Sequence, residues 1–501
     1  NGTCSGFSGV QEIWYGANNS WKIAPATSGI SCSNATFGDP LNGTAKNCYY
    51  KAYSGTWTPS TTAGSLNTDG FFYSRVQVCD VDGSDSRDYG LCKKYPSGNF
   101  KPIGAIQKYS DQLRLAAFGY LMDQTASYNP GGRYGGVLRA PMKYVGAKTF
   151  DVNGVDNTPS TGNPVKEWDE ATGVFIVNPA GDAAYGKSGV ITYLNQFGRT
   201  GPVAGRYKIY DPVGELHYEA LRYLQGLQPS LDAVSNIQPA MYDGFPVTTT
   251  WTDPYEGRSN TTDYSCLKSN IVVIGDINTH DGNRLPAANA ANNIPDINYW
   301  RSIVQSFEKN SSTTYADGQG TSRTTGNPNG GNGSVPGGTQ TSQIMGSAYW
   351  AHTHDIRGTN WTGTGGPAKQ RPGLRVKTFT FDVNEYAAQN DANTRRYANQ
   401  LFMAAKYGGF ETDPSNLGKA PYNTFGNPFK KQDGTNDNDV WQDPANPGEA
   451  STYYLQSNAR GVLNAFDSIF SRASTAARSI AGGAIQSKNL TQAGDTIYQG
   501  T

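Results

Sequence analysis

The spacing of apolar residues divides the chain into a part without a sustained period and a longer part with regular patterns. Residues 1–70 are dominated by Gly, Ser, Thr, Asn and aromatic residues, so we expect loops and short edge strands there. From residue 71 the texture changes, and residues 72–78 alternate as a half-buried strand does. We therefore interpret residues 1–70 as a loop-rich, disulfide-bearing lead-in or insertion and residues 71–485 as the main domain.

Helical and strand-like patterns follow one another through the middle of the chain. A helix is predicted from Pro102 onward, leading directly into an apolar strand at residues 115–121. A second helix is predicted to open at Asp211, which is available as its N-cap. The apolar run at residues 271–276 is typical of a buried parallel strand, which would deliver Asp276 to the carboxyl edge of a sheet. This order of elements predicts an α/β fold.

The C-terminal part has a further strand and two helices. The strand is predicted at residues 374–381 and a short helix at residues 396–407. A final amphipathic helix is predicted from about residue 460 to 480. We see no repeat of solenoid or propeller period, so these elements are assigned to the same α/β domain.

Two segments rich in Gly, Pro and Asn interrupt the regular patterns. They span about residues 129–205 and 309–346, and we interpret both as insertions. The first contains brief strand-like pieces at residues 144–145 and 174–177. Residues 486–501 are interpreted as a linker toward a missing C-terminal domain.

Composition excludes two classes of partner and favours an exported protein. The 501 residues include 41 Lys and Arg and 41 Asp and Glu, so the chain lacks the basic surplus typical of nucleic-acid binding. No window approaches the roughly 18 consecutive apolar residues of a membrane-spanning helix. Charged residues are only 16% and there are 31 Tyr, a composition typical of loop-rich extracellular proteins. The sequence starts at Asn1 without an initiator Met, and we interpret it as a processed or truncated piece.

Six cysteines predict disulfides and therefore an oxidising compartment. The chain has no C-x-x-C pair and only four His, which disfavours a zinc site. Two pairs of cysteines flank short polar segments and are expected to bond first, and the remaining pair follows by elimination. The expected pairs are Cys79–Cys92, Cys32–Cys48 and Cys4–Cys266. The alternative is six unpaired thiols. Disulfides persist outside the cytosol, so the pattern favours the periplasm or the cell surface.

A series of short motifs spans most of residues 71–480. In order, they are RVQVCD from residue 75, NFKPIG from 99, IQKY from 106, GGVLR from 135, YDPVGEL from 210, EALRY from 219, GDINTH from 275, HDIR from 354, VKTFTFDV from 376 and AAKYGGF from 404. With these motifs the chain resembles the type IV pilus assembly and tip-adhesin family, the PilC/PilY-like proteins. Their order and spread make the resemblance far more specific than one short motif.

The resemblance implies a fold, a location and partners. Members of this family have a von Willebrand factor A-like N-terminal region, with a doubly wound, mainly parallel sheet, followed by a C-terminal β-propeller. This chain resembles the A-like region alone, with long loop- and β-rich insertions. The family's first core strand, with its D-x-S-x-S metal motif, is then expected upstream of residue 1. The resemblance further implies export through the periplasm to the pilus tip, with minor pilins or other tip proteins and a host or abiotic surface as partners.

The same resemblance implies one divalent cation, Mg²⁺ or Ca²⁺, at the carboxyl edge of the sheet. Hard cations of this kind prefer oxygen ligands. The resemblance places Asp276 at the acidic metal position and Asp211 where typical A domains carry Thr. That substitution adds negative charge, which favours Ca²⁺ or marks a degenerate site. The alternatives are a turn-starting acid for Asp276 and a plain helix N-cap for Asp211.

A literal D-x-S-x-S match occurs further along the chain, at Asp82, Ser84 and Ser86. It lies inside the segment that the expected Cys79–Cys92 bond would close. A solvated Asp/Ser turn is therefore the favoured interpretation, and a metal role for these three residues is the alternative.

Two other patterns are weak candidates for metal ligands. His352 and His354 would share one face of a strand and could hold a metal, although isolated loop histidines are commoner. The acidic stretch after Asp276 lacks the spacing and the closing Glu of an EF-hand, so we reject that motif.

No enzymatic activity is predicted. A nucleophile elbow, a P-loop and a dinucleotide fingerprint are all missing from the required strand-turn-helix context. The abundant Tyr and Trp suit a surface that binds carbohydrate or protein. The sequence therefore favours a surface-exposed adhesin or assembly module of a type IV pilus tip protein. The alternatives are a self-assembling extracellular structural subunit and a secreted glycan-active enzyme.

Overall fold

The structure is a computed structural model in which a defined set of residues is described. These are residues 2–18, 20–52, 79, 91–122, 134–198, 211–277, 284–326, 342–411, 425–456, 458–474, 484–485 and 497–498. The chain divides into two compact units, residues 1–77 and 78–501, each of which is described by itself.

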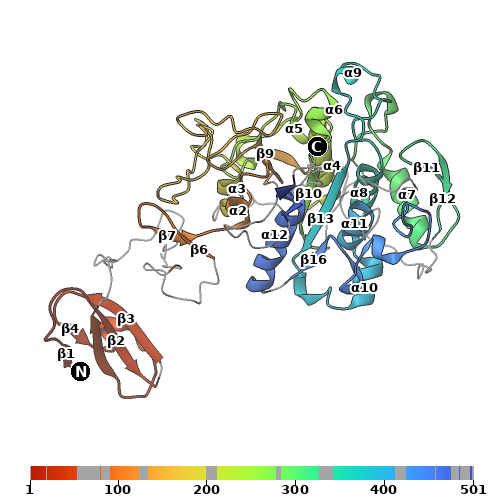
Figure 1. The fold of residues 1–501 in the computed structure, drawn as a ribbon. Helices are drawn as coiled ribbons and strands as arrows, with labels where there is room; N and C mark the ends of the chain where they lie inside the picture. The colour runs from red at the N-terminus through yellow and green to blue at the C-terminus, as the bar shows by residue number, and fades with distance from the viewer. Residues whose placement is uncertain are drawn as a thin grey trace. The chain divides into compact units, whose positions relative to one another are not determined.

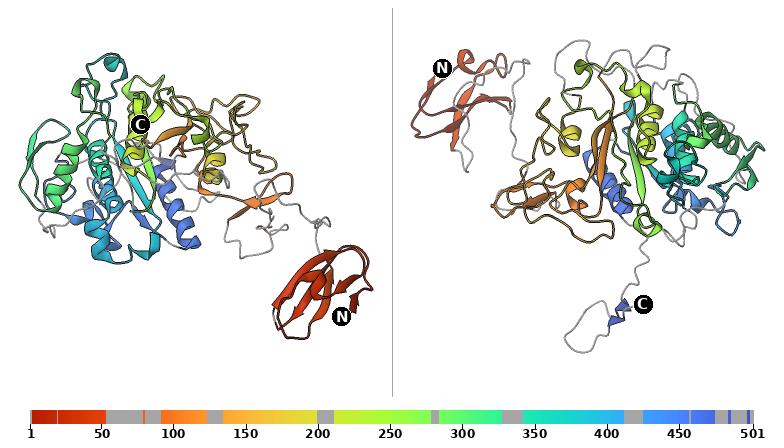
Figure 2. Two further views of the ribbon diagram at one scale, coloured as in Figure 1. Left: turned by 180° about the vertical axis from the view of Figure 1, so that it is seen from behind. Right: turned by 90° about the horizontal axis from the view of Figure 1, so that it is seen from above.

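The N-terminal unit is a small antiparallel β structure (Figure 2). Its elements are β1 (Gly2–Cys4), β2 (Gln11–Ala17), β3 (Ser20–Ala26), β4 (Ile30–Cys32), α1 (Asn34–Phe37) and β5 (Asn47–Ala52). The central strand β2 pairs with β3 and β5, and β1 pairs with β4. Ile13 and Tyr15 alternate with half-buried neighbours in β2 and are buried. This pairing is more regular than the loops and short edge strands expected from the sequence.

The larger unit is built around a parallel sheet. Its strands are β10 (Ser269–Gly275), β13 (Val376–Asp382) and β16 (Tyr453–Leu455), in the order β10-β13-β16. The two longer strands confirm the strands predicted at residues 271–276 and 374–381. Alternating burial in β10 places Ile271 and Val273 in the main hydrophobic core.

Four helices lie on one side of this sheet (Figure 1). They are α4 (Val213–Leu224), α7 (Ile297–Glu308), α8 (Gln343–Thr353) and α11 (Gln400–Gly409). The side chain of His217 in α4 bonds Thr378 of β13, and Thr380 of β13 donates to the carbonyl of Leu401 in α11. Every residue of α8 is buried, as expected of a helix packed on all sides. A Cβ at Gly346 would lie 2.4 Å from the α7 backbone, so this glycine permits the close contact of α7 and α8.

One helix, α12 (Ala459–Ser474), covers the opposite side of the sheet. The ring of Phe466 stacks on Phe381 with centroids 4.9 Å apart, and the guanidinium of Arg472 lies 5.3 Å from the Phe379 ring centroid. The sheet therefore has helices on both faces, as in a doubly wound α/β fold (Figures 1 and 2). This arrangement confirms the predicted mixed α/β class. The more specific prediction, a von Willebrand factor A-like topology, stays a proposal.

The segment before the sheet differs from the prediction. It contains β6 (Cys92–Lys94), β7 (Phe100–Pro102), α2 (Ala105–Lys108), β8 (Leu115–Gly119) and β9 (Val137–Lys143). The helix predicted from Pro102 is wrong, because Pro102 lies in β7 and α2 makes a single turn. The strand predicted at residues 115–121 is present as β8, but it pairs antiparallel with β9, which lies within the insertion predicted at about residues 129–205.

The predicted C-terminal helices are largely present. Instead of one helix at 396–407, the chain forms α10 (Ala392–Ala398) and α11, separated at Asn399. Asn399 interrupts the helix because its side chain accepts bonds from the backbone of Leu401 and Phe402, as an N-cap does. The last helix, α12, is described as far as Ser474.

The remaining elements are short. They are α3 (Val190–Gln196), α5 (Leu231–Val234), η2 (Pro239–Met241), α6 (Thr261–Tyr264), η3 (Ala290–Asn292), β11 (Thr314–Ala316), β12 (Ser322–Thr324), α9 (Gly366–Lys369), η4 (Glu385–Ala387), η6 (Asn438–Val440), β14 (Gln442–Asp443), β15 (Asn446–Ala450), β17 (Ala484–Ile485) and β18 (Ile497–Tyr498). Of the strand-like pieces predicted in the first insertion, only Phe175 takes part in an isolated bridge, with Trp168, in the described part of the chain. No helix in the described part is both long and apolar enough to cross a membrane.

Candidate functional site

The carboxyl edge of the parallel sheet is where the sequence placed a metal site. Asp276 directly follows β10, and Asp211 precedes α4. The C-terminal end of α4 lies near the start of β13, because Arg357 donates to the carbonyl of Leu224 and the adjacent Ile356 donates to that of Leu374. The first turn of α4 therefore lies toward the end of the sheet where Asp276 is found.

The structure places the predicted ligands without assembling them into a complete site. Asp211 and Asp276 are both half-buried. Among the residues that the structure describes, neither belongs to a group of three or more His, Cys, Asp and Glu whose ligand atoms lie together. Asp211 is also not the N-cap of α4, since Pro212 occupies that position. Asp82, Ser84 and Ser86 lie outside the described residues.

A buried carboxylate in the first turn of α4 marks the same edge. Glu215 has no exposed surface and receives two bonds from Arg284, at 3.1 and 3.2 Å, and one from the backbone of Gly135 at 2.8 Å. A negative charge is favoured at a helix N-terminus, and Arg284 supplies the counter-charge. Arg284 is thus tied to the first turn of α4.

A second acid lies one turn further along α4. Glu219 accepts bonds from the hydroxyl of Tyr134 at 3.0 Å, the backbone of Ser230 at 3.1 Å and the Ser230 hydroxyl. Burial raises the pKa of Glu219, and Arg222 and these hydrogen bonds oppose that shift. Both acids lie within motifs that carry the family resemblance, although their spacing in those motifs predicts no role for them. Two carboxylates at i and i+4 of one helix, Glu215 and Glu219, were the available signal.

The end of β13 is closed by a hydrogen-bond network. Asp382 has no exposed surface and accepts bonds from the backbone of Asn384 at 2.8 Å, the amide of Asn399 at 2.7 Å and the hydroxyl of Tyr453 at 2.8 Å. Burial next to this carboxylate raises the pKa of Tyr453, which stays a neutral donor. The network fixes the strand end and α11, and it leaves no open carboxylate at this position.

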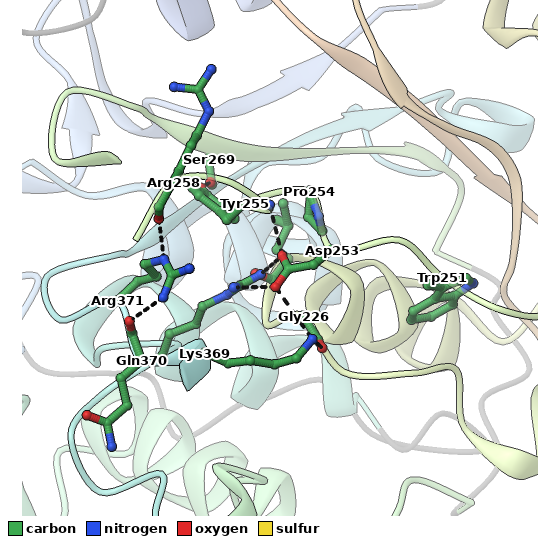
Figure 3. Close-up of polar contacts among 12 residues, drawn as sticks. Gly226, Trp251, Asp253, Pro254, Tyr255, Arg258, Ser269, Lys369, Gln370 and Arg371 are labelled. Carbon is green, nitrogen blue, oxygen red and sulfur yellow. Dashed lines mark hydrogen bonds and ion pairs between the residues drawn. The ribbon is translucent and has the colours of Figure 1, made fainter. Parts of the chain in front are cut away.

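At the opposite end of α4, a cluster of cations surrounds Asp253 (Figure 3). Arg357 donates to both oxygens of Asp253, at 2.6 and 3.0 Å, and Lys369 lies 3.5 Å from one of them. Burial tends to raise the pKa of Asp253, but the bonds and charge of Arg357 outweigh it, so the net shift is downward. Arg357 also donates to Leu224 and Lys369 to Gly226, which places both cations at the negative end of the helix dipole.

Glycine is required where α4 ends in this cluster. Gly226 has φ +71°, and a Cβ there would lie 2.7 Å from Asp253 and 2.8 Å from Arg357. Nearby, Arg371 donates to the carbonyls of Arg258 and Gln370 (Figure 3). The cluster therefore joins α4, the chain around Asp253 and the chain from Arg357 to Arg371. Its ion pairs and hydrogen bonds hold these three segments together, so its role is structural.

One arrangement looks like a nucleophile and base. Ser347 lies 2.9 Å from His217 Nδ1, and His217 Nε2 lies 3.1 Å from Thr378 Oγ1. Ser347 and Thr378 have no exposed surface and His217 is 1% exposed, so a substrate cannot reach them. Burial lowers the pKa of His217 to about 3. The chain of hydrogen bonds serves to join α4, α8 and β13.

His352 and His354 do not face a common metal position. His352 is the penultimate residue of α8, not part of a strand, and its ring nitrogens face the carbonyls of Phe410 at 2.6 Å and Val376 at 3.3 Å. His354 instead contacts Thr353 and Ala316. The strand on which the two would share a face is absent here, so that premise is wrong.

The cysteines form two of the three expected bonds. Cys32–Cys48 and Cys79–Cys92 are disulfides, and Cys4 and Cys266 are free thiols. The third expected bond, Cys4–Cys266, is not formed in this structure and stays a prediction, because it would join the two separate units. Cys4 lies in β1, paired with β4, and its sulfur is within 4.8 Å of both sulfurs of the Cys32–Cys48 bond. Cys266 belongs to the other unit and is exposed.

Comparison with known proteins gives the chain its relatives. Residues 118–347 match a family described as "PilY1 homolog, second domain", a stretch that runs from β8 to α8. The type IV pilus biogenesis factor PilY1 homolog of Xylella fastidiosa is 30% identical over 425 residues, which cover 79% of this chain and 31% of that protein. The chain thus spans about a third of the length of this curated relative. No solved structure matches it. The chain is therefore a relative of the PilY1 homologs, a family that includes this type IV pilus biogenesis factor.

Proposed function

We propose that the chain is a non-enzymatic, surface-exposed module that supports type IV pilus assembly and attachment at the pilus tip. The observation that carries the proposal is its similarity to a type IV pilus biogenesis factor over 79% of the chain. The two disulfides suit a protein exported through the periplasm to the cell surface. Its partners would be minor pilins or other tip proteins and a host or abiotic surface.

The burial of three acids argues against a catalytic role for them. Glu215, Glu219 and Asp382 all lack exposed surface and are held by hydrogen bonds or an ion pair. Catalytic acids must reach a substrate, so these residues serve packing and orientation instead. No observation favours the secreted glycan-active enzyme.

An in-frame deletion of this chain's coding region tests the proposed function. We expect fewer surface pili and weaker attachment to surfaces, both restored by the wild-type chain. An Asp467→Asn variant, which alters an exposed side chain of α12, serves as the complementation control. Normal piliation together with normal attachment in the deletion strain would contradict the proposal.

We also propose that the larger unit is von Willebrand factor A-like and binds one divalent cation, Mg²⁺ or Ca²⁺, at its carboxyl sheet edge. Its support is the parallel sheet with helices on both faces and the position of Asp276 after β10. The oxygens of Asp276 and Asp211 suit a hard cation, and further ligands would have to be hydroxyls, water or residues outside those described. Arg284 already neutralises Glu215 at this edge, which limits the charge left for a cation.

Thermal unfolding with and without EDTA tests the cation. We expect EDTA to lower the Tm of the wild-type chain and to leave the Tm of Asp276→Ala unchanged, because binding to the native state alone adds stability. A matched Asp467→Asn control should respond to EDTA as the wild type does. Equal melting of wild type and Asp276→Ala in both conditions would rule out a cation held by Asp276.

A further inference from the structure

Three sulfur atoms meet inside the N-terminal unit. Cys4 of β1, Cys32 of β4 and Cys48 of β5 have Sγ atoms that all lie within 4.8 Å of one another. Cys32 and Cys48 are joined in a disulfide, and Cys4 is a buried free thiol. A free thiol therefore lies directly beside a disulfide of the same unit.

This cluster suits exchange between a thiol and a disulfide better than it suits a metal ion. The thiolate is the form of cysteine that binds metals, and two of the three sulfurs here are bonded to each other. A disulfide instead reacts with a neighbouring thiolate, which attacks one sulfur and releases the other. The number of S–S bonds does not change, so the reaction needs neither an oxidant nor a reductant.

The sulfur of Cys4 needs only a small movement to attack. Reacting atoms must approach to about 3–3.5 Å, so a shift of at most about 2 Å from the observed arrangement is enough. Strand β1 is three residues long and, in the described part of the chain, pairs only with β4. Between β1 and β2 the chain passes Gly6 and Gly9, at φ +91° and +75°, where an added Cβ would meet nothing within 4 Å. Glycines in such open surroundings change conformation at little cost, which permits this shift of β1.

The register of β1 and β4 indicates which sulfur is attacked. Cys4 pairs with Ile30 and Gly2 pairs with Cys32, so Cys4 and Cys32 are diagonal neighbours in one ladder. Diagonal residues of an antiparallel pair lie about 7–8 Å apart, whereas Cα atoms joined by a disulfide lie about 4.4–6.8 Å apart. Within the described residues β5 is not paired with β1, so no ladder fixes the distance from Cys4 to Cys48. The favoured new bond is therefore Cys4–Cys48.

We propose that the N-terminal unit is a site of thiol–disulfide exchange in which Cys4 displaces Cys32 from Cys48. The Cys4 thiolate attacks Cys48 Sγ, and the Cys32–Cys48 bond breaks with its electron pair leaving on Cys32 Sγ. Cys32 then takes up the proton that Cys4 has lost. Cys4 is buried and Cys32 is half-buried, so the exchange moves the free thiol to a more accessible position. This proposal does not depend on the pilus function, and either can fail without the other.

Alkylation over time, followed by disulfide mapping, tests the exchange. The full chain carries Cys266→Ser, because the exposed Cys266 thiol could attack disulfides of other molecules. It is kept folded without reductant in the presence of an alkylating reagent, which traps any thiol that becomes accessible. The chain is then digested in acid, where thiolates are protonated and exchange stops. We expect label to accumulate on Cys32, and a Cys4–Cys48 peptide pair to appear in the same molar amount as the Cys32–Cys48 pair disappears.

A matched variant and an internal control assign the label to the exchange. Cys4→Ser keeps the shape of the side chain and removes the attacking sulfur, so it should leave Cys32 unlabelled. Dilution of the chain should not slow the labelling, because the reaction is intramolecular. The Cys79–Cys92 bond belongs to the other unit and should stay unlabelled, which excludes unfolding and general reshuffling.

Four results would overturn the proposal. An intact Cys32–Cys48 bond after prolonged incubation would show that no exchange takes place. Equal labelling of Cys32 in the Cys4→Ser variant would mean that the bond opens by another route. Label on Cys48, together with a Cys4–Cys32 bond, would contradict the direction inferred from the ladder. A wild-type chain in which Cys4 is already bonded to Cys266 would lack the attacking thiol.

Discussion

Arg357 and Lys369 both bind Asp253 at the C-terminal end of α4, and this cluster depends on a single carboxylate. Arg357 has no exposed surface and the Asp253 side chain is 14% exposed. Breaking a buried ion pair by removing one partner costs about 3–5 kcal/mol, because the remaining charge stays buried without a partner. We therefore predict that Asp253→Asn lowers the free energy of unfolding by about that amount.

Chemical denaturation of wild type and variant measures this loss. The matched control is Asp467→Asn, since Asp467 pairs with Lys108 while about half of each side chain is exposed. Exposed pairs contribute little, so the control should unfold nearly as the wild type does. Equal denaturation midpoints for Asp253→Asn and Asp467→Asn would show that the ion pairs of Asp253 add no stability.

The free thiols give a second test at the residue scale. Cys266 is exposed, whereas Cys4 is buried at 8% exposure beside the Cys32–Cys48 bond. Alkylation of the native chain should modify Cys266 quickly and Cys4 only after unfolding, because a buried thiol is shielded from the reagent. Mass spectrometry then finds two labelled cysteines per unfolded chain. An unfolded, unreduced chain without free thiols would instead support the Cys4–Cys266 bond.

Residue roles were predictable from sequence only where local spacing decided them. The bonds Cys32–Cys48 and Cys79–Cys92 each join cysteines that flank a short segment, with separations of 16 and 13 residues. The fate of Cys4 depends on the pairing of β1 with β4, which no local pattern reveals. Asp253 and Arg357 lie 104 residues apart, so their contact was equally invisible before the fold was known.

At the scale of elements, Asn399 holds the start of α11. Its side chain accepts bonds from the backbone of Leu401 at 2.8 Å and Phe402 at 2.9 Å, and donates to Asp382 at 2.7 Å. Losing an N-cap costs about 1 kcal/mol, and leaving a buried carboxylate short of a donor costs about 1–3 kcal/mol more. We predict that Asn399→Ala lowers the free energy of unfolding by about 2–4 kcal/mol in denaturant titrations.

An exposed cap in the preceding helix is the control for that prediction. Asp391 caps α10 by accepting a bond from the backbone of Thr394 at 2.7 Å. Asp391→Ala loses a cap without disturbing a buried network, so its effect should be clearly smaller. Equal losses for the two variants would show that the bond from Asn399 to Asp382 adds no stability.

Elements with an uninterrupted pattern were predicted well. The apolar run of β10 and the helical spacing of α4 gave their types and approximate bounds. Strand β9 was missed because Arg139 and Pro141 break its apolar pattern. Arg139 is nevertheless buried, with its guanidinium donating to the carbonyls of Tyr120 and Tyr242. The helix expected from Pro102 failed because its apolar spacing is shared between β7, α2 and the following turn.

For the whole molecule, two buried histidines predict a loss of stability in mild acid. Burial lowers the pKa of His217 to about 3 and that of His352 to about 4, against about 6.5 in an unfolded chain. Between these values the unfolded state binds more protons, so the free energy of unfolding falls as the pH falls below about 6.5. Each histidine contributes about 1.4 kcal/mol per pH unit over most of that range.

Denaturant titrations at pH 7, 6 and 5 measure this dependence. His217→Gln should reduce the slope of the free energy of unfolding against pH by the contribution of one histidine, because one proton fewer is taken up on unfolding. A free energy of unfolding that stays constant from pH 7 to pH 5 would show that the two rings are not held neutral in the folded chain.

The class of the whole molecule followed from its sequence more readily than its sites did. Ordered motifs across residues 71–480 indicated the family, and the parallel strands followed from their apolar runs. The metal site remains a prediction, since Asp211 and Asp276 are brought to one end of the sheet without a third described ligand of the same kind. Ligand sets depend on loops from several elements, and sequence spacing does not fix how those loops meet.

The proposed place at the pilus tip is tested most directly by the abundance of this polypeptide in sheared type IV pilus filaments, relative to the major pilin. Peptide quantification by mass spectrometry of the filament fraction supplies the ratio. A tip module predicts that the polypeptide is present at a small fraction of the major pilin and falls further as filaments lengthen. Equal molar amounts along the filament would make it a structural subunit, and absence from the fraction would contradict a place at the pilus tip.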